Sequence, residues 1–274
     1  MPSLELHPAI GTLRYTLRGL YRDGETQAEK ASRLRQEGFQ IATFDLTSPA
    51  GHPLFAVAAR HDVTPIPRAG IPQVHTADWE ATRMAVEVFR RTVRAAPKGV
   101  RWYKGLDIEG LRRCIRSYDW TGTHRAVATG ILSKTILAHP FPNANHRTSL
   151  YLTRMFLLSL GLPWPSYELR GRGIRRFTHD TESFFHRSKF LLQLVRHRPL
   201  IRLAYDEGFT HLTIGPNDVA ISVADLGLDG TDIRARHRRL CENLIVELSD
   251  ESGRFLLNRS NESSLGDWIR RVRR

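Results

Sequence analysis

The sequence of 274 residues contains little cysteine and no long apolar run. Its two cysteines, Cys114 and Cys241, are too few for a disulfide framework or a zinc site, so we expect free thiols in a reducing compartment. The most apolar stretch, residues 150–162, is interrupted by Arg154 and is shorter than the roughly 20 residues of a membrane helix. The N-terminus shows no basic region followed by an apolar one, so we expect no signal peptide. Together these features predict a cytoplasmic protein that does not enter a membrane.

The apolar residues that are present recur mainly at helical spacing. They make up 41% of the chain, enough to form a buried core. The spacing predicts helices over residues 26–37, 78–95, 108–117, 124–137, 148–160, 181–197, 234–248 and 263–272. Strands are expected over residues 39–44, 53–58, 211–214 and 219–224. The predicted fold class is mainly α, with a helical bundle core over residues 73–203 and α/β extensions over 1–72 and 204–274 that add small β elements at both ends.

The net charge of +13 is distributed unevenly along the chain. Residues 83–116 and 170–202 each carry a net charge of +7, whereas residues 203–230 carry −5. The two basic blocks flank the segment with the most informative motif. They indicate either a funnel for an anionic substrate such as ATP, RNA or an acidic protein, or Arg-rich helix faces in contact with solvent.

That motif is the segment His-Pro-Phe-Pro-Asn-Ala-Asn-His-Arg over residues 139–147, between two predicted helices. Two prolines stiffen its first half, and Ala144 is small enough for a ligand to approach the backbone. The amides that follow Ala144 are expected to point along the next helix and form an anion-binding nest. Arg147 adds a permanent charge suited to phosphate, and His139 at the mouth of the loop is a candidate proton acceptor. A base beside an anion nest is the combination that phosphoryl or nucleotidyl transfer requires.

This segment resembles the signature of the Fic/Doc family, HxFx(D/E)(A/G)NxR, and the resemblance extends over residues 75–200. The matching positions are His139, Phe141, Ala144, Asn145 and Arg147. The resemblance implies a Fic-like helical bundle that binds ATP or a related nucleotide, usually with Mg²⁺. It also implies transfer of AMP, or of phosphate in Doc-like members, to a Ser, Thr or Tyr hydroxyl of a target protein.

By the same resemblance, each matching residue has an expected role. His139 is the general base, and Phe141 is the structural anchor of the loop. The nucleotide-binding set is Asn143, Ala144, Asn145, His146 and Arg147.

Three positions depart from the family pattern. Asn143 replaces the acidic residue that holds the metal, and an amide oxygen is a weaker, neutral ligand for Mg²⁺. His146 lies where AMP-transferring members have glycine and Doc has lysine, and Leu150 replaces a second arginine. The last two differences favour the Doc-like branch. Whether AMP or phosphate is transferred, and whether a metal binds, stays open at this point.

The chain has no complete (S/T)xxxE(G/N) inhibitory motif, so we expect any inhibitor to be a separate chain, as in toxin–antitoxin pairs. Residues 98–106 are the candidate hairpin for docking the target. Two other hypotheses compete with the transferase. A degenerate Fic domain would bind nucleotide or protein without transfer. A basic nucleic-acid-binding protein ranks last, because no recognised nucleic-acid motif is present.

Overall fold

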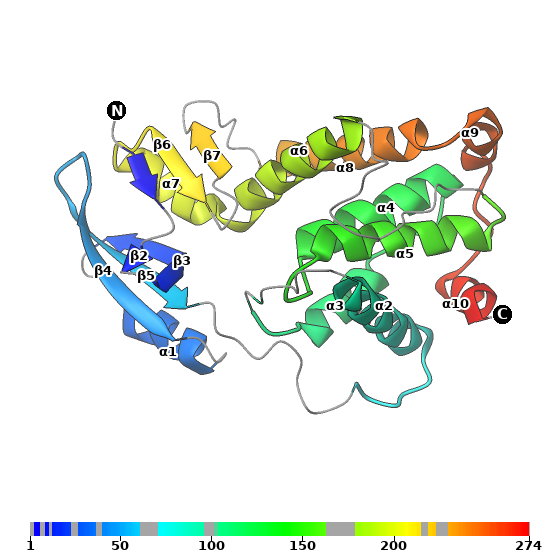
Figure 1. Cartoon of the computed structure of the whole chain (residues 1–274), viewed down its shortest axis with the longest axis horizontal. Coiled ribbons are helices and arrows are strands. Elements are labelled where there is room, and N and C mark those ends of the chain that lie inside the picture. The colour runs from blue at the N-terminus through cyan, green and yellow to red at the C-terminus, as the bar shows by residue number, and fades with distance from the viewer. Residues whose placement is uncertain are drawn as a thin grey trace. The chain divides into compact units, whose positions relative to one another are not determined.

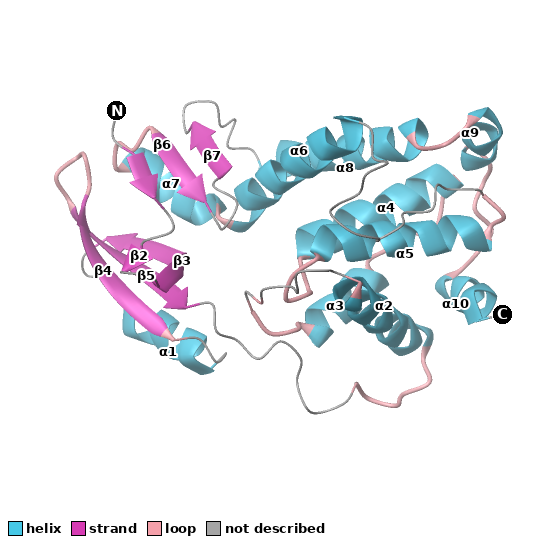
Figure 2. Ribbon diagram, in the orientation of Figure 1, coloured by secondary structure: helices cyan, strands magenta, loops and turns pink. Residues whose placement is uncertain are grey.

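The computed structural model describes residues 3–5, 9–10, 13–22, 27–36, 40–60, 71–95, 102, 104–162, 179–214, 219–222 and 230–273. Within these ranges the chain is mainly α-helical, with a small antiparallel sheet near the N-terminus (Figures 1 and 2), which confirms the predicted class. None of the helices in these ranges is long and apolar enough to cross a membrane.

Ten helices lie in the described ranges. They are α1 (Gln27–Gln36), α2 (Ala77–Arg94), α3 (Ile108–Arg116), α4 (His124–Ala138), α5 (Asn145–Ser159), α6 (His179–Arg196), α7 (Arg198–Asp206), α8 (Gly230–Glu247), α9 (Glu251–Leu257) and α10 (Leu265–Arg273). Eight of them overlap predicted helices. Helix α7 was not predicted: it begins directly after α6, with Pro199 in its first turn, where proline is tolerated. Helix α9 was also missed, since seven residues are too few for a clear periodicity.

The strands form two small sheets. They are β1 (Ser3–Glu5), β2 (Ala9–Ile10), β3 (Leu13–Arg22), β4 (Ile41–Thr47), β5 (Pro53–Arg60), β6 (His211–Ile214) and β7 (Val219–Ser222). One sheet is antiparallel in the order β2-β3-β5-β4. In the other, β6 pairs with β1 in parallel and with β7 in antiparallel orientation. The predicted hairpin is β4–β5, but β3 was missed because a bulge between Leu17 and Gly19 interrupts its alternation.

The chain forms two compact units that are not continuous in sequence. The smaller comprises residues 1–65, 102–105 and 189–234, and the larger comprises residues 66–101, 106–188 and 235–274. The two sheets, α1 and α7 belong to the smaller unit, whereas α2 to α5, α9, α10 and most of α8 belong to the larger. The predicted three-part division at residues 72 and 203 stays a prediction.

Helix α5 lies at the centre of the larger unit, packed against α4, α2 and α10. Its buried side chains include Leu152 and Phe156, and the rings of Trp120 and Trp268 contact Phe156 at centroid distances of 5.9 and 6.3 Å. The sequence predicted this central position from the apolar composition of the helix. Both cysteines of the chain, on α3 and α8, are buried free thiols of this unit, as expected.

In the smaller unit, a buried carboxylate connects α7 to the sheet. Glu207, at the end of α7, is fully buried and accepts hydrogen bonds from Arg22 Nε at 2.6 Å and Ser48 Oγ at 2.9 Å. Its second oxygen also lies 2.8 Å from His52 Nδ1. Ser48 and His52 bracket the β4–β5 turn, in which Gly51 adopts a φ of 85°. The carboxylate thus fastens the tip of this hairpin to the helix.

Candidate active-site loop

The loop between α4 and α5 contains two backbone conformations that are unusual for residues other than glycine. His139, the C-cap residue of α4, has a φ of 47°, and Ala144, the N-cap residue of α5, has a φ of 54°. Among the described residues, these are the only non-glycine positions with positive φ. A left-handed conformation costs an ordinary residue about 1–2 kcal/mol and persists only where surrounding contacts impose it. Both ends of the loop between α4 and α5 are therefore held in strained geometry.

Asn145 supplies the contacts that hold the loop in this form. Its Oδ1 accepts a hydrogen bond from Phe141 N, and its Nδ2 donates to Phe141 O, both at 2.9 Å. The same Nδ2 lies 3.2 Å from Nε2 and 3.4 Å from Nδ1 of the His139 ring. One buried amide thus spans the loop and lies next to the imidazole predicted to be the base.

Phe141 fixes the middle of the loop to the core. Its side chain is fully buried, and its ring stacks on Phe89 of α2 at a centroid distance of 5.1 Å and an interplanar angle of 16°. The carbonyl of the preceding residue, Pro140, accepts a hydrogen bond from Asp107 N at 2.9 Å. The loop is therefore attached to α2 and to the start of α3.

The N-terminus of α5 differs from three other helix starts in this protein. Asp107, Thr123 and Asp250 accept hydrogen bonds from first-turn amides of α3, α4 and α9, respectively. The N-cap residue of α5 is Ala144, whose side chain cannot accept a hydrogen bond from the first-turn amides. The hydrogen bond from Thr148 N to Ala144 O is the first backbone hydrogen bond of this helix. The positive end of the helix dipole at α5 is thus not neutralised by a cap side chain, which is the condition that favours an anion there.

The side chain of Asn143 takes part in the hydrogen bonding of the loop. Its Oδ1 accepts a hydrogen bond from the backbone N–H of Ala144, so this oxygen stabilises the loop itself. The part of the chain that the structure describes contains no group of three or more His, Cys, Asp or Glu residues suited to a metal ion. The loop over residues 139–147 thus supplies no carboxylate for Mg²⁺.

Arg147 and His146 are adjacent on α5 but lie in different environments. Arg147 is exposed, whereas His146 is buried and its Nε2 lies 2.9 Å from Ser188 Oγ on α6. One turn after Arg147, burial raises the pKa of Tyr151, and the positive charges of Arg154 and Arg147 oppose that rise. Arg147 thus faces the same side of the helix as Tyr151.

A groove runs along this side of α5. It has a volume of about 720 Å³ and is formed by α2, α5 and α10. Its lining residues are Glu80, Arg83, Met84, Glu87, Val88, Arg91, Thr92, Ala95, Tyr151, Met155, Val272 and Arg273. Sequence analysis did not predict it, because its walls come from three separated segments.

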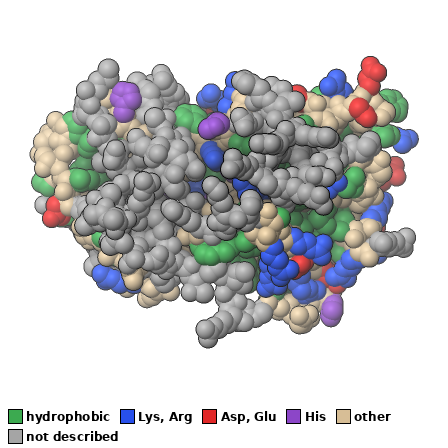
Figure 3. Space-filling view, in the orientation of Figure 1, with side chains coloured by type: hydrophobic (Ala, Val, Ile, Leu, Met, Phe, Trp, Pro, Cys, Tyr) green, Lys and Arg blue, Asp and Glu red, His purple; other side chains and the backbone are tan. Residues whose placement is uncertain are grey.

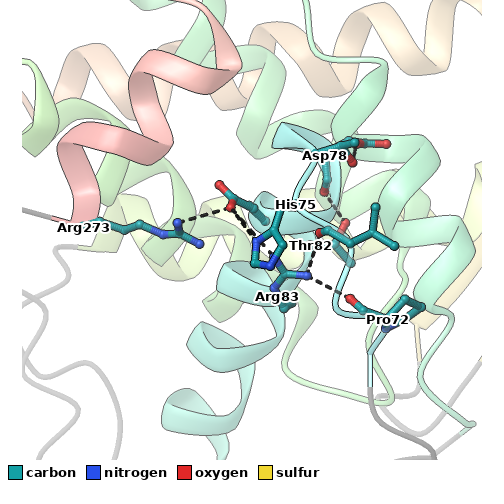
Figure 4. Close-up of polar contacts among 9 residues, drawn as sticks. Pro72, His75, Asp78, Thr82, Arg83 and Arg273 are labelled. Atoms are coloured by element: carbon teal, nitrogen blue, oxygen red, sulfur yellow. Dashed lines mark hydrogen bonds and ion pairs between the residues drawn. The ribbon is translucent and has the colours of Figure 1, made fainter.

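One rim of the groove is built around Glu80 (Figure 4). Its carboxylate lies 3.3 Å from Arg273 of α10 and 3.6 Å from His75. Arg83 donates to the carbonyl oxygens of Pro72 and Val74, at 2.8 and 2.9 Å. These contacts fasten the end of α10 and the segment before α2 to the same helix.

Lys and Arg side chains gather over α2 and α10 on the face shown in Figure 3. The exposed members are Arg90, Arg91, Arg94, Arg270, Arg271 and Arg273. Part of the first predicted basic block is therefore a surface patch. Residues 170–178 of the second block, and residues 98–101 and 103 of the candidate docking hairpin, lie outside the described residues.

The chain belongs to a family of unknown function (DUF8172), which residues 60–274 match. The matched range includes the whole larger unit and with it the loop over residues 139–147. No curated protein and no solved structure is significantly similar to the chain.

Proposed function

We propose that this member of a family of unknown function is a Fic/Doc-like transferase, which moves AMP or phosphate from ATP to a hydroxyl side chain of a target protein. The observation that carries the proposal is the form of the loop over residues 139–147. Its two strained caps place an imidazole at one end and a helix N-terminus without a side-chain cap at the other. The helical bundle around α5 would then be the Fic-like core that the motif implies.

In the proposed reaction the hydroxyl oxygen of the target attacks a phosphorus atom of ATP. His139 accepts the hydroxyl proton as the new O–P bond forms. The bond from phosphorus to its leaving oxygen breaks, which releases pyrophosphate after AMP transfer or ADP after phosphate transfer. The first-turn amides of α5 and the exposed guanidinium of Arg147 stabilise the negative charge on the phosphate oxygens.

The environment of Leu150 supports the Doc-like variant of this proposal. Leu150 is buried, so the position three residues after Arg147 faces the core of the larger unit. A second arginine at that position would point away from the cradle. With one guanidinium in the motif, the loop is better suited to holding a single phosphate than an extended pyrophosphate, which favours phosphate transfer.

The test is to incubate the protein with a lysate and with ATP labelled at either the α or the γ phosphate. Label from the α position identifies AMP transfer, and label from the γ position identifies phosphorylation. His139→Ala should lower the labelling by a factor of about 10² to 10⁴, the usual contribution of a general base. His186→Ala, at an exposed histidine of α6, is the matched control and should label normally. Equal labelling by wild type and His139→Ala would refute the transferase.

A second candidate is a degenerate Fic domain that binds nucleotide or protein without transfer. The hydrogen bond that Ala144 N donates to the Asn143 side-chain oxygen favours this second candidate. The oxygen stabilises the loop at the position where the family pattern has a metal ligand. Calorimetric titration with ATP separates the two candidates. ATP affinity that Arg147→Ala abolishes, without histidine-dependent label from either phosphate, would support the binding module.

If the protein is a toxin of this class, its inhibitor is a separate chain. Nucleic acid is the least favoured partner. Binding to nucleic acid would decline steeply with salt and would not depend on His139.

A further inference from the structure

A continuous chain of buried side-chain hydrogen bonds crosses the larger unit. Ser133 Oγ on α4 lies 2.8 Å from His237 Nδ1 on α8, and His237 Nε2 lies 2.8 Å from Ser188 Oγ on α6. Ser188 Oγ in turn lies 2.9 Å from His146 Nε2 in the first turn of α5. Helix α4 ends at the candidate loop and α5 begins after it. This series of hydrogen bonds therefore connects the two helices that flank the loop.

These groups cannot form a second reactive centre. The side chains of Ser188 and His237 are fully buried, and those of Ser133 and His146 are nearly so. No substrate can reach the Ser188 hydroxyl beside its two imidazoles. These hydrogen bonds can therefore affect the candidate loop only through the position and protonation of His146.

The acceptors available to each hydrogen favour one direction for this series of hydrogen bonds. Among the described residues, the two imidazoles are the only partners of the Ser188 hydroxyl, whereas the Ser133 hydroxyl lies 2.8 Å from His237 Nδ1 and also contacts the Cys241 thiol. If Ser133 donates to Nδ1, then His237 donates from Nε2 to Ser188, and Ser188 donates to His146 Nε2. Among the described side chains, the reverse order would leave the Ser133 hydrogen with the Cys241 sulfur, which is a much weaker acceptor than an imidazole nitrogen.

Two further observations agree with this direction. Burial lowers the pKa of His237 to about 4, so its ring is neutral near pH 7 and carries one hydrogen. Burial also raises the pKa of Cys241, so this thiol keeps its hydrogen, and its Sγ lies 3.7 Å from the same Nδ1. The Ser133 hydroxyl and the Cys241 thiol thus each carry a hydrogen that can be donated to Nδ1, as an accepting nitrogen requires.

We propose that Ser188 and His237 are positioning residues of the loop over residues 139–147, which hold His146 as a neutral tautomer with its hydrogen on Nδ1. The ring fixes the first turn of α5 between Asn145 and Arg147. The charge of the phosphate cradle then comes from Arg147 and the helix terminus, and not from His146. The last statement rests on the proposed function, whereas the tautomer does not.

The decisive measurement is the ¹⁵N spectrum of the histidine rings in the full chain at pH 7. His146→Gln and His237→Gln assign the two signals. We expect the hydrogen of His237 on Nε2 and that of His146 on Nδ1, so the two rings show opposite tautomers. A charged His146 ring, or a His146 hydrogen on Nε2, overturns the proposal. If a variant fails to fold, assignment of the ring signals through the backbone resonances of the wild-type protein identifies the same two rings.

Variants of Ser188 then test the coupling. Ser188→Ala removes the donor to His146 Nε2 and should shift the His146 signal toward a mixture of tautomers, whereas Ser188→Thr should keep the wild-type signal. Ser249→Ala is the control, because this buried hydroxyl donates to the backbone oxygen of Ile245, with no other partner among the described residues, and should leave both rings unchanged. An unchanged His146 signal in Ser188→Ala would contradict the coupling.

Activity supplies a separate readout. In the label-transfer assay, Ser188→Ala should lower kcat by about tenfold to a hundredfold, the effect of displacing a reacting group by about 1 Å. Ser249→Ala should retain the wild-type rate. A kcat for Ser188→Ala equal to that of wild type would overturn the positioning role. If the wild type transfers no label, the proposed function fails, and the ring spectra still decide whether the hydrogen-bond chain exists.

Discussion

A buried polar network in the smaller unit and one in the larger unit have opposite electrostatic character. In the smaller unit, Glu207 is ionised and receives hydrogen bonds from a guanidinium, a hydroxyl and an imidazole. In the larger unit, burial keeps His237 neutral near pH 7, and its partners Ser133 and Ser188 are uncharged hydroxyls. The comparison shows two ways to satisfy a buried titratable group: charged partners for an ion, or a directed series of neutral donors and acceptors.

The pKa shifts of the two central groups reflect this difference. Burial by itself would raise the pKa of Glu207, but the hydrogen bonds from His52, Arg22 and Ser48 outweigh burial and lower it to about 2. For His237 burial is the only cause, and it lowers the pKa to about 4. Glu207 is therefore held in its charged form and His237 in its uncharged form.

The largest expected effect comes from removing the charged centre. Glu207→Ala leaves the buried Ser48 hydroxyl without its acceptor and Arg22 without its counter-ion, so we expect a loss of about 3 kcal/mol in the free energy of unfolding. Urea denaturation measures this loss. Asp206→Ala, at the exposed neighbouring carboxylate, should change stability by less than about 0.5 kcal/mol. Equal losses in the two variants would show that the Glu207 network is not stabilising.

Acidification should destabilise the protein through the two networks in two different pH ranges. The unfolded chain binds a proton at His237 near pH 6.5, whereas the folded protein binds it only near pH 4, so acid favours unfolding between these values. We expect this site to remove at most about 3 kcal/mol of stability as the pH falls from 6.5 to 4. For Glu207 the corresponding loss falls between about pH 4.5 and 2.

Denaturation curves across pH 4 to 7 test this separation. His237→Gln should flatten the dependence of stability on pH between 6.5 and 4, and His186→Gln should not. A wild-type curve with no slope in this window would mean that His237 titrates normally in the folded protein.

Ser48→Ala tests the outer part of the charged network. The Ser48 hydroxyl donates to a carboxylate at 2.9 Å, and a hydrogen bond to a charged group contributes about 1.5–3 kcal/mol. We therefore expect a loss of about 2 kcal/mol, measured by thermal unfolding. The pKa of Glu207 should also rise, which would move the acid transition to higher pH. An unchanged acid transition would contradict the role of this hydroxyl.

Ser133→Ala is the matched change in the neutral network and should have the smallest effect. Its hydroxyl bonds an uncharged imidazole at 2.8 Å, and Cys241 remains as a weak donor to the same nitrogen. We expect a loss of about 1 kcal/mol in thermal unfolding, the usual contribution of a neutral hydrogen bond. A loss as large as that of Ser48→Ala would remove the distinction between the networks.

The local features of the fold could be predicted from the sequence. Apolar periodicity identified α4 and α5, and the Ser-Pro-Ala-Gly turn over residues 48–51 identified the β4–β5 hairpin. Local sequence also located the loop over residues 139–147. Its strained caps were not predictable, because neither histidine nor alanine signals a positive φ.

The two networks could not be predicted, because their members are far apart in sequence. Ser133 and His237 are separated by 104 residues, and Ser48 and Glu207 by 159. His237 has no metal-ligand partners at a convincing spacing in the sequence, so the sequence alone predicts a surface or packing residue. A single sequence carries no signal for contacts formed only when several helices pack together.

The burial of both thiols provides a way to observe opening of the larger unit alone. Burial raises the pKa of Cys114 to about 11 and that of Cys241 further, so neither sulfur is a nucleophile in the folded state at neutral pH. An alkylating reagent should therefore react only with molecules in which α3 or α8 has detached. The smaller unit has no cysteine, so its unfolding would not lead to alkylation. The rate of alkylation would therefore report how often the helices around α5 separate.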